Sequence, residues 1–293
     1  EELCSYNTFL KRHKLGLSMS PDKIRDLLIE RRCPAIDDTR NSLYRIFNGD
    51  FTSGGRFYRG WWQNIPRDLR KHLTIDGEPC SELDYSGQHL LLLYARGGDE
   101  YRWLKGLDDD PYALEGYGDE VRDLLKVATL ILVNEPNRRK AIQAIRKKIN
   151  YDFPALQSTD AFINPLIDGM MEKHPMVRQH FFSGSGSALQ FQDSQIAAYV
   201  LTHMQAHGYV ALPVHDSFVV QDRHLGQLYS LMKEAYRMLG VESIPEIKIK
   251  KGAHTTFAEP HFKSLWQEID KDKLLKRNEI EAIKALEDIE TLE

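Results

Sequence analysis

The chain has 293 residues, of which 42% are hydrophobic and 28% are charged, and its formal net charge is −4. This composition is typical of a globular protein, and the length provides for one large domain or two modest ones. No apolar run approaches the ~20 residues that a membrane span needs, and the N-terminal residues do not form a signal peptide. Three cysteines without metal-ligand spacing favour free thiols in a reducing compartment, so we expect a cytoplasmic protein without a membrane partner.

The first 50 residues favour short helices. The sequence begins at Glu1 rather than at Met, so we expect further residues upstream. Ser20 and Pro21 are a typical N-cap and first-turn pair for a helix. The amphipathic segment 39–47 is predicted to be a second helix. The segment 52–60 is rich in glycine and aromatic residues, which is typical of a loop or hairpin where the backbone closely approaches another group.

The rest of the chain predicts a mixture of strands and helices without an internal repeat. In chain order these are a strand over 80–85, an interruption at Gly87, helices over 90–95 and 119–133, a basic helix near 138–148, a helix over 193–207, two short strands within 208–221 that meet at 214–217, a helix over 224–239, an edge strand over 244–250, and a charged amphipathic helix from Ser264 that is expected to dock or to bind a protein partner.

The charge is unevenly distributed. Residues from Gln267 onward include nine acidic and five basic side chains, so the rest of the chain is neutral. Within that neutral part, six basic residues and no acidic ones occur over 138–148. Such a run is typical either of a solvated helix face or of a nucleic-acid contact. On the second interpretation Arg138, Arg139 and Lys140 would bind nucleic acid.

Asp84 and Asp216 each occur at the end of an apolar strand, beside a small polar residue. An aspartate in this position is often only a turn former. However, Mg²⁺ is usually held by one or two carboxylates plus substrate phosphates. Two such ions ~3.5–4 Å apart can activate an attacking oxygen and stabilise a leaving one. Two aspartates on adjacent strands of one sheet are well suited to bridge that pair of ions.

Arg122 and Lys126 are four residues apart on a predicted helix and therefore share one face. Neighbouring acidic residues could neutralise them. Alternatively, the forked guanidinium and the compact ammonium could grip a polyphosphate. Leu130 and Asn134 continue the same face, which would place them beside the nucleotide sugar or base.

Taken in order, several short motifs resemble the palm and fingers of family A DNA polymerases and the related single-subunit RNA polymerases. The resemblance covers roughly residues 50–222, and its strength lies in the order of motifs that are individually weak. The matching segments are Gly55-Arg56, Gln63-Asn64-Ile65-Pro66, Asp84-Tyr85-Ser86, the pair Arg122 and Lys126, the helix segment Gln192 to Ala198, and Val214-His215-Asp216.

The resemblance implies a role for each matching residue. Asp84 and Asp216 would bind two Mg²⁺ ions, which Mn²⁺ could replace, with help from the Tyr85 carbonyl. Arg122 and Lys126 would hold the triphosphate, and Lys126 could protonate the leaving pyrophosphate. The nucleic-acid contacts would come from Arg56, Gln63, Asn64, Gln192 and His215.

The sequence departs from the family pattern at the positions that select the sugar. DNA-synthesising members have a Glu five residues after the first Asp and an aromatic residue on the fingers helix. Here these positions hold His89, Leu130 and Asn134. Ser217 follows the second Asp, as in the RNA polymerase branch, where DNA polymerases have Glu. His89 or Asn134 could bond a ribose 2′-hydroxyl, or neither could, so both sugars stay open.

The resemblance implies an α+β fold, namely a right-hand palm with a small antiparallel sheet and helices, helical fingers and a rudimentary thumb. The expected segments are a thumb-like region over 1–50, palm over 51–118, fingers over 119–182, palm over 183–263 and a charged helix over 264–293.

The expected function is template-directed nucleotide addition to a 3′-hydroxyl, with a template, a primer and (d)NTPs as partners. A gap-filling or primase-like enzyme of a mobile element would fit. Three alternatives stay open: an RNA-synthesising enzyme, a template-independent transferase, and an inactive palm that serves as a nucleic-acid-binding scaffold.

Overall fold

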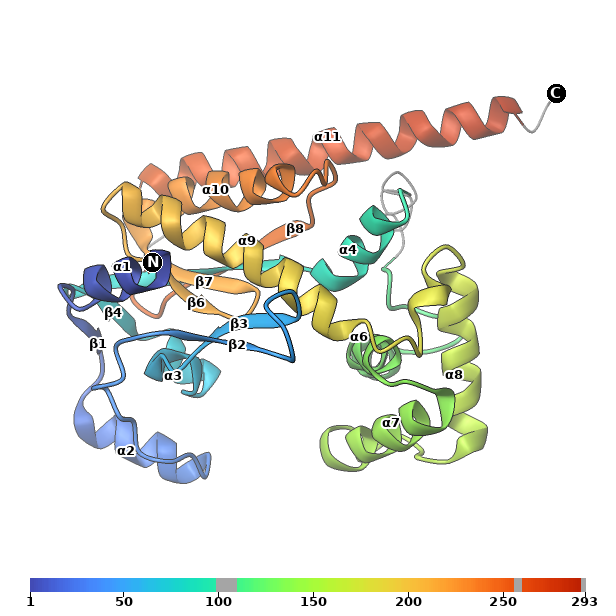
Figure 1. Cartoon of the computed structure of the whole chain (residues 1–293), viewed down its shortest axis with the longest axis horizontal. Coiled ribbons are helices and arrows are strands. Elements are labelled where there is room, and N and C mark those ends of the chain that lie inside the picture. Colours follow the sequence, from blue (N-terminus) through green and yellow to red (C-terminus); the bar gives the residue numbers. More distant parts are fainter. Residues whose placement is uncertain (99–109, 256–259, 291–293) are drawn as a thin grey trace. The chain divides into compact units, whose positions relative to one another are not determined.

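The computed structural model describes residues 1–98, 110–255 and 260–290 as a mixed α+β chain (Figure 1). It divides into two compact units: unit 1 comprises Glu1–Gln88 and Phe191–Leu274, and unit 2 comprises His89–Gln190 and Leu275–Glu293. Part of the expected palm segment, 99–109, and the end of the expected tail helix, 291–293, lie outside the described residues. None of the helices in the described ranges is long and apolar enough to cross a membrane.

Unit 1 is built on an antiparallel sheet whose central strand is β5. The strand order is β1-β4-β5-β7-β6, and β8 also pairs with β5. Consequently, β5 has β7 on one side and β8 on the other along its second half. The strands are β1 (Leu15–Leu17), β4 (Leu73–Ile75), β5 (Glu78–Ser86), β6 (Leu212–Val214), β7 (Ser217–Gln221) and β8 (Glu246–Lys250), and a separate hairpin consists of β2 (Tyr44–Phe47) and β3 (Gly54–Tyr58).

Alternation along β5 separates a core face from a polar face. Leu83 and Tyr85 are buried, and the Tyr85 hydroxyl donates to the Met232 carbonyl oxygen at 2.6 Å. Met232 belongs to α10 (Leu225–Met238), so this helix covers the core face. Because neighbouring side chains on a strand point to opposite faces, Glu82 and Asp84 share the other face.

The long helix α11 (Pro260–Glu290) lies alongside α10 through its first part (Figure 1). Asp272 of α11 accepts hydrogen bonds from the Tyr229 hydroxyl at 2.7 Å and from Lys233 Nζ at 2.6 Å. The expected tail helix is therefore present and begins four residues early. Leu274 and Leu275 on it are exposed, and its binding of a partner stays a prediction.

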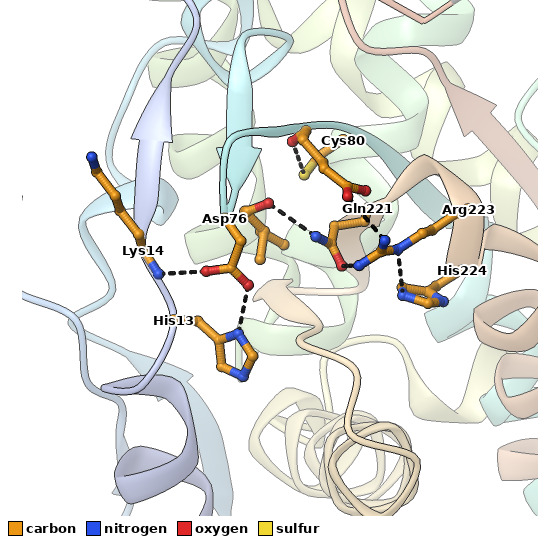
Figure 2. Close-up of polar contacts among 9 residues, drawn as sticks. His13, Lys14, Asp76, Cys80, Gln221, Arg223 and His224 are labelled. Atoms are coloured by element: carbon orange, nitrogen blue, oxygen red, sulfur yellow. Dashed lines mark hydrogen bonds and ion pairs between the residues drawn. The ribbon is translucent and has the colours of Figure 1, made fainter.

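A polar cluster fixes the end of the sheet that lies away from Asp84 (Figure 2). Asp76, in the turn between β4 and β5, accepts hydrogen bonds from His13 Nδ1 at 2.7 Å and the Lys14 amide at 2.8 Å. Gln221, the last residue of β7, donates to the Ile75 carbonyl at 3.0 Å. Asp76 and Gly77 both have positive φ, as a two-residue hairpin turn of type I′ requires. The cluster therefore holds β1, β4, β5 and β7 together.

One predicted element of the N-terminal region was wrong. The segment 39–47 is not helical, because Tyr44–Phe47 forms β2 and pairs with β3. Apolar residues at positions 43 and 47 fit a helix and an extended strand equally well, and pairing with β3 decides between them. Helices α1 (Glu2–Leu10) and α2 (Pro21–Glu30) are present as expected, with Ser20 as the N-cap of α2.

Unit 2 is helical, and each of its helices buries an apolar stripe. In α6 (Asp119–Asn134), for example, Leu124 and Leu132 are fully buried. The Tyr94 hydroxyl and His174 Nδ1 lie 2.9 Å apart and join the end of α4 to the residue that caps α8. The other α-helical segments among the described residues of this unit are α4 (Gln88–Arg96), α7 (Arg138–Asp152), α8 (Asp160–Lys173), the start of α9 (Gly186–Ala206) and the end of α11.

Candidate active site

The fold brings Asp84 and Asp216 together at one end of the β5–β7 pair. Asp84 lies near the end of β5, opposite Ser217 in the ladder, and Asp216 occupies the two-residue turn that precedes β7. The Tyr85 amide donates to the Asp216 carbonyl oxygen at 3.4 Å. The pKa of Asp84 is raised, first by burial and then by the negative charge of Asp216. The two carboxylates therefore repel each other.

Lys250 and Glu82 lie beside Asp84, and the sequence motifs predicted neither residue as part of the site. Lys250 Nζ, on β8, lies 2.8 Å from Asp84 Oδ2 and 2.9 Å from Glu82 Oε1. Burial would lower the pKa of Lys250, but the two carboxylates outweigh it and raise the pKa. The ammonium therefore stays protonated and partly neutralises Asp84.

Ser217 takes part in the site through Glu82. The Ser217 hydroxyl donates to Glu82 Oε1 at 2.7 Å, and Arg70 Nε donates to Glu82 Oε2 at 3.1 Å. Burial would raise the pKa of Glu82, but Lys250, Arg70 and Ser217 together lower it. Glu82 is therefore a buried carboxylate that stays ionised and organises three donors.

The aspartate pair has the chemistry to hold Mg²⁺. A group of three or more His, Cys, Asp or Glu side chains that could hold a metal does not occur among the described residues. Mg²⁺ does not need one, because it usually keeps several waters and takes one or two carboxylates plus substrate phosphates. A divalent cation would also relieve the repulsion that raises the pKa of Asp84.

A polar pocket of about 510 Å³ adjoins Asp216 in unit 1. It brings together three residues expected from the motifs, Tyr58 of the aromatic-rich segment 52–60, and three residues that sequence reasoning missed. His215 has a φ of 58°, a strained conformation of the kind that clusters at functional sites. Its ring centroid lies 6.4 Å from that of Tyr58, which lies 6.4 Å from that of Tyr44. The lining residues are Gln63, Asn64 and His215, together with Arg40, Tyr44, Tyr58 and Arg59.

Two of the expected nucleic-acid contacts are partly enclosed by the protein. Arg56 Nε lies 2.6 Å from Asp193 Oδ2, and only 18% of the Arg56 side chain is exposed. Burial raises the pKa of Asp193, and Arg56 opposes that rise. Gln192 is half-buried, and its Oε1 has no hydrogen-bond partner among the described residues. Arg56 therefore fixes α9 against β3 with the part of its guanidinium that faces Asp193.

In unit 2, α6 presents the expected nucleotide contacts along one face. Lys126 and Leu130 are exposed, and Lys126 forms no ion pair with any residue that the structure describes. Arg122 is already occupied, because Asp110 accepts from its Nε at 2.5 Å and Asp123 from its Nη1 at 2.9 Å. Asn134 donates to the Leu130 carbonyl at 2.7 Å. The four expected nucleotide contacts, which are spaced four residues apart, therefore lie along one face of α6, as the sequence predicted.

The basic run on α7 is divided between structural and exposed side chains. Arg138 pairs with Asp168 at 2.6 Å and also bonds Asn164, so it joins α7 to α8. Arg139 and Lys140 are exposed and form no ion pair within the described chain. His89, at one of the positions expected to select the sugar, lies in the first turn of α4 and is half-buried.

No protein-family model and no curated protein matches this sequence. Among solved structures, the chain is similar to the POL domain of Pol1 from M. smegmatis in complex with DNA primer-template and dNTP. The sequence identity is 13% and the TM-score is 0.48, over 78% of this chain and 50% of that chain. The present chain therefore spans half the length of that polymerase chain.

Proposed function

We propose that this protein is a template-directed nucleotidyltransferase that adds nucleotides to a 3′-hydroxyl. The observation that carries the proposal is the proximity of Asp84, on β5, to Asp216, in the turn that precedes β7, since the charge of Asp216 raises the pKa of Asp84. Such a pair can bind a divalent cation together with substrate phosphates, and here it lies beside a pocket of aromatic, amide and basic side chains.

Asp84 and Asp216 would hold two Mg²⁺ ions, or Mn²⁺ in their place, and the Tyr85 carbonyl would assist. Bound there, the ions would activate the attacking 3′-oxygen and stabilise the charge on the leaving pyrophosphate. Lys250 holds Asp84 in place through its 2.8 Å contact and would give up part of that contact when a cation arrives. Glu82 would then keep Lys250 close to the site.

The α6 face would bind the nucleotide. The 3′-hydroxyl would lose its proton to solvent water, and its oxygen would form a bond to the α-phosphorus while the bond from that phosphorus to pyrophosphate breaks. Lys126 Nζ would neutralise the triphosphate and donate a proton to the pyrophosphate, which suits its exposed position. Arg122 would exchange Asp110 or Asp123 for a phosphate oxygen.

The pocket around His215 would hold the end of the primer strand. Tyr44 and Tyr58 offer ring faces to bases, and each base–aromatic stack contributes about 1–3 kcal/mol. Asn64, Arg40 and Arg59 line the same pocket and could bond the sugar or the phosphate.

A second candidate, an inactive palm that serves as a nucleic-acid-binding scaffold, is favoured by the ion pairs. Asp84 already forms an ion pair with Lys250, and Arg122 already forms ion pairs with two carboxylates. In a scaffold these pairs would be permanent, whereas in an enzyme they would exchange for metal and phosphate.

The test is extension of a labelled primer–template with Mg²⁺, and with Mn²⁺ in parallel. Separate reactions contain the four dNTPs or the four NTPs, with no-primer and no-template controls. Templated extension with either nucleotide set is expected, and the preferred set identifies the sugar. Untemplated tailing would indicate a template-independent transferase. No incorporation with either metal would overturn the enzyme proposal and favour the nucleic-acid-binding scaffold.

A further inference from the structure

A second pocket, of about 330 Å³, lies on the polar face of unit 1, along β5 and β8 and away from the end that carries Asp84. Its walls include five cationic side chains and one carboxylate, Glu82. The whole chain has a net charge of −4, so average composition does not account for this excess of positive charge. The cationic residues are Arg67 and Arg70 of α3 (Arg67–Arg70), Lys71, Lys250 and Lys251.

The pocket is held open by fixed contacts. Glu82, only 6% exposed, binds Arg70 Nε at 3.1 Å and Lys250 Nζ at 2.9 Å, so it positions both cations. Gly252 allows β8 to approach β5, because a Cβ atom there would lie 2.0 Å from the Cys80 carbonyl oxygen. The Gly252 amide donates to Ser81 Oγ at 2.9 Å and closes this end of the pocket.

Two of the cations have no partner among the residues that the structure describes. Arg67 and Lys71 are exposed, and neither side chain forms a hydrogen bond or an ion pair with the described residues. Arg70 contacts Glu82 through Nε, so its two terminal nitrogens remain for another acceptor. A forked guanidinium flanked by ammonium groups matches the geometry and the charge of a phosphate group.

We propose that this pocket binds a phosphate group in the backbone of a nucleic-acid strand whose end lies at Asp84 and Asp216. The proposal rests on the proposed function, since it assigns the pocket to the same strand. A β-strand rises about 3.4 Å per residue, so Glu82 and Asp84 are about 7 Å apart along β5. The pocket thus shares one sheet face with Asp84, about two residues along β5, and none of its lining residues belongs to α6.

The test measures anion binding without metal or nucleotide. A labelled single-stranded oligonucleotide is titrated by fluorescence anisotropy over a series of salt concentrations. The variant is Arg67→Gln with Lys71→Gln, and the matched control is Lys11→Gln with Arg12→Gln, which removes one exposed lysine and one exposed arginine from the end of α1. All four positions are exposed, and circular dichroism verifies that both double variants are folded.

The pocket variant is expected to bind the oligonucleotide about tenfold or more weakly at low salt. Its slope of log K against log salt should be shallower by about 1.4, since each phosphate contact on a single strand contributes about 0.7. The control variant should match the wild type. Equal behaviour of the two double variants would overturn the proposal.

A second arm titrates pyrophosphate by calorimetry and distinguishes a strand phosphate from a free one. Loss of pyrophosphate binding in the pocket variant, with unchanged oligonucleotide binding, would overturn the strand assignment. Primer extension by the same variants separates this proposal from the proposed function. If primer extension depends on Asp84 but the pocket variant binds the oligonucleotide as the wild type does, the phosphate-binding role of the pocket is wrong and the proposed polymerase function stands.

Discussion

Replacement of Glu82 with glutamine should destabilise unit 1, although the two side chains have nearly the same shape. Glu82 accepts from Lys250 at 2.9 Å, Arg70 at 3.1 Å and Ser217 at 2.7 Å. An amide oxygen can still accept from one of these donors, but it carries no charge. The substitution therefore leaves half-buried Arg70 without its compensating carboxylate and leaves half-buried Lys250 with Asp84 alone.

The size of this effect follows from the contacts. A hydrogen bond to a charged group contributes about 1.5–3 kcal/mol and a neutral one about 0.5–1.5 kcal/mol. Replacing two hydrogen bonds to a charged acceptor with neutral ones should therefore lower the free energy of unfolding by about 2–3 kcal/mol. At about 2–4 °C per kcal/mol, the Tm should fall by about 5–10 °C. The matched control is Glu78→Gln on the same strand, since its ion pair with Arg223 is exposed and should contribute less than about 1 kcal/mol.

Asp84→Asn, two residues along β5, should have the opposite effect. The pKa of Asp84 is raised, so the fold disfavours its ionised form. For such a group the stabilising contribution is full below the unfolded pKa of about 3.9 and is lost as the pH rises through the folded pKa. At neutral pH the wild type therefore carries a cost that asparagine removes, and the Tm should rise.

The pH dependence gives a separate check. The pKa of Glu82 is lowered in the fold, so its contribution is present above the unfolded pKa of about 4.3 and is lost as the pH falls through the folded value. Glu82→Gln should flatten this acid limb of stability against pH. Thermal and urea unfolding from about pH 2 to about pH 7 measures the stability of all three variants across this acid limb. A lower Tm for Asp84→Asn, or an unchanged Tm for Glu82→Gln, would refute the reasoning.

Three further substitutions test other parts of the account. Lys126→Ala should lower kcat/KM for nucleotide incorporation about 10²–10³-fold, as for loss of one transition-state contact, while Lys147→Ala on α7 should not; equal values for the two variants would remove Lys126 from catalysis. His215→Gly should be about 1 kcal/mol more stable to urea than His215→Ala, because glycine tolerates the φ of 58° without the strain that alanine has there. A glycine variant that is less stable than the alanine variant would contradict this. Asp272→Asn weakens the acceptor for Tyr229 and Lys233, so the urea midpoint should fall by an amount equivalent to about 1 kcal/mol, and an unchanged midpoint would show that α11 docks without it.

The sequence predicted the strands that carry the aspartates because their apolar runs are short and end at polar turns. β7 and the turn at Asp216 lie within the expected range 208–221, and β5 contains the expected strand 80–85 but begins two residues earlier and ends one residue later. The Asp76-Gly77 pair is a typical hairpin signal that would also have predicted the turn between β4 and β5. β2 was mistaken for a helix because a four-residue spacing of apolar positions does not distinguish the two structures.

The partners of Asp84 were not predictable from spacing. Lys250 is 168 residues from Glu82 in the chain, and only the register of β8 against β5 brings their side chains to one face. Alternation shows that Lys248 and Lys250 share a face of β8 but not which one. Tyr44 was missed for a related reason, since it meets Tyr58 across a hairpin whose first strand was assigned to a helix.

The most direct test of the central claim is incorporation of one templated nucleotide by three variants under single-turnover conditions with Mg²⁺. Asp84→Asn and Asp216→Asn should abolish incorporation while remaining folded and binding the primer–template. Asp76→Asn, which removes a carboxylate from the opposite end of the same sheet, should retain it. Wild-type turnover by either of the first two variants would contradict the assignment of Asp84 and Asp216 as the metal-binding pair.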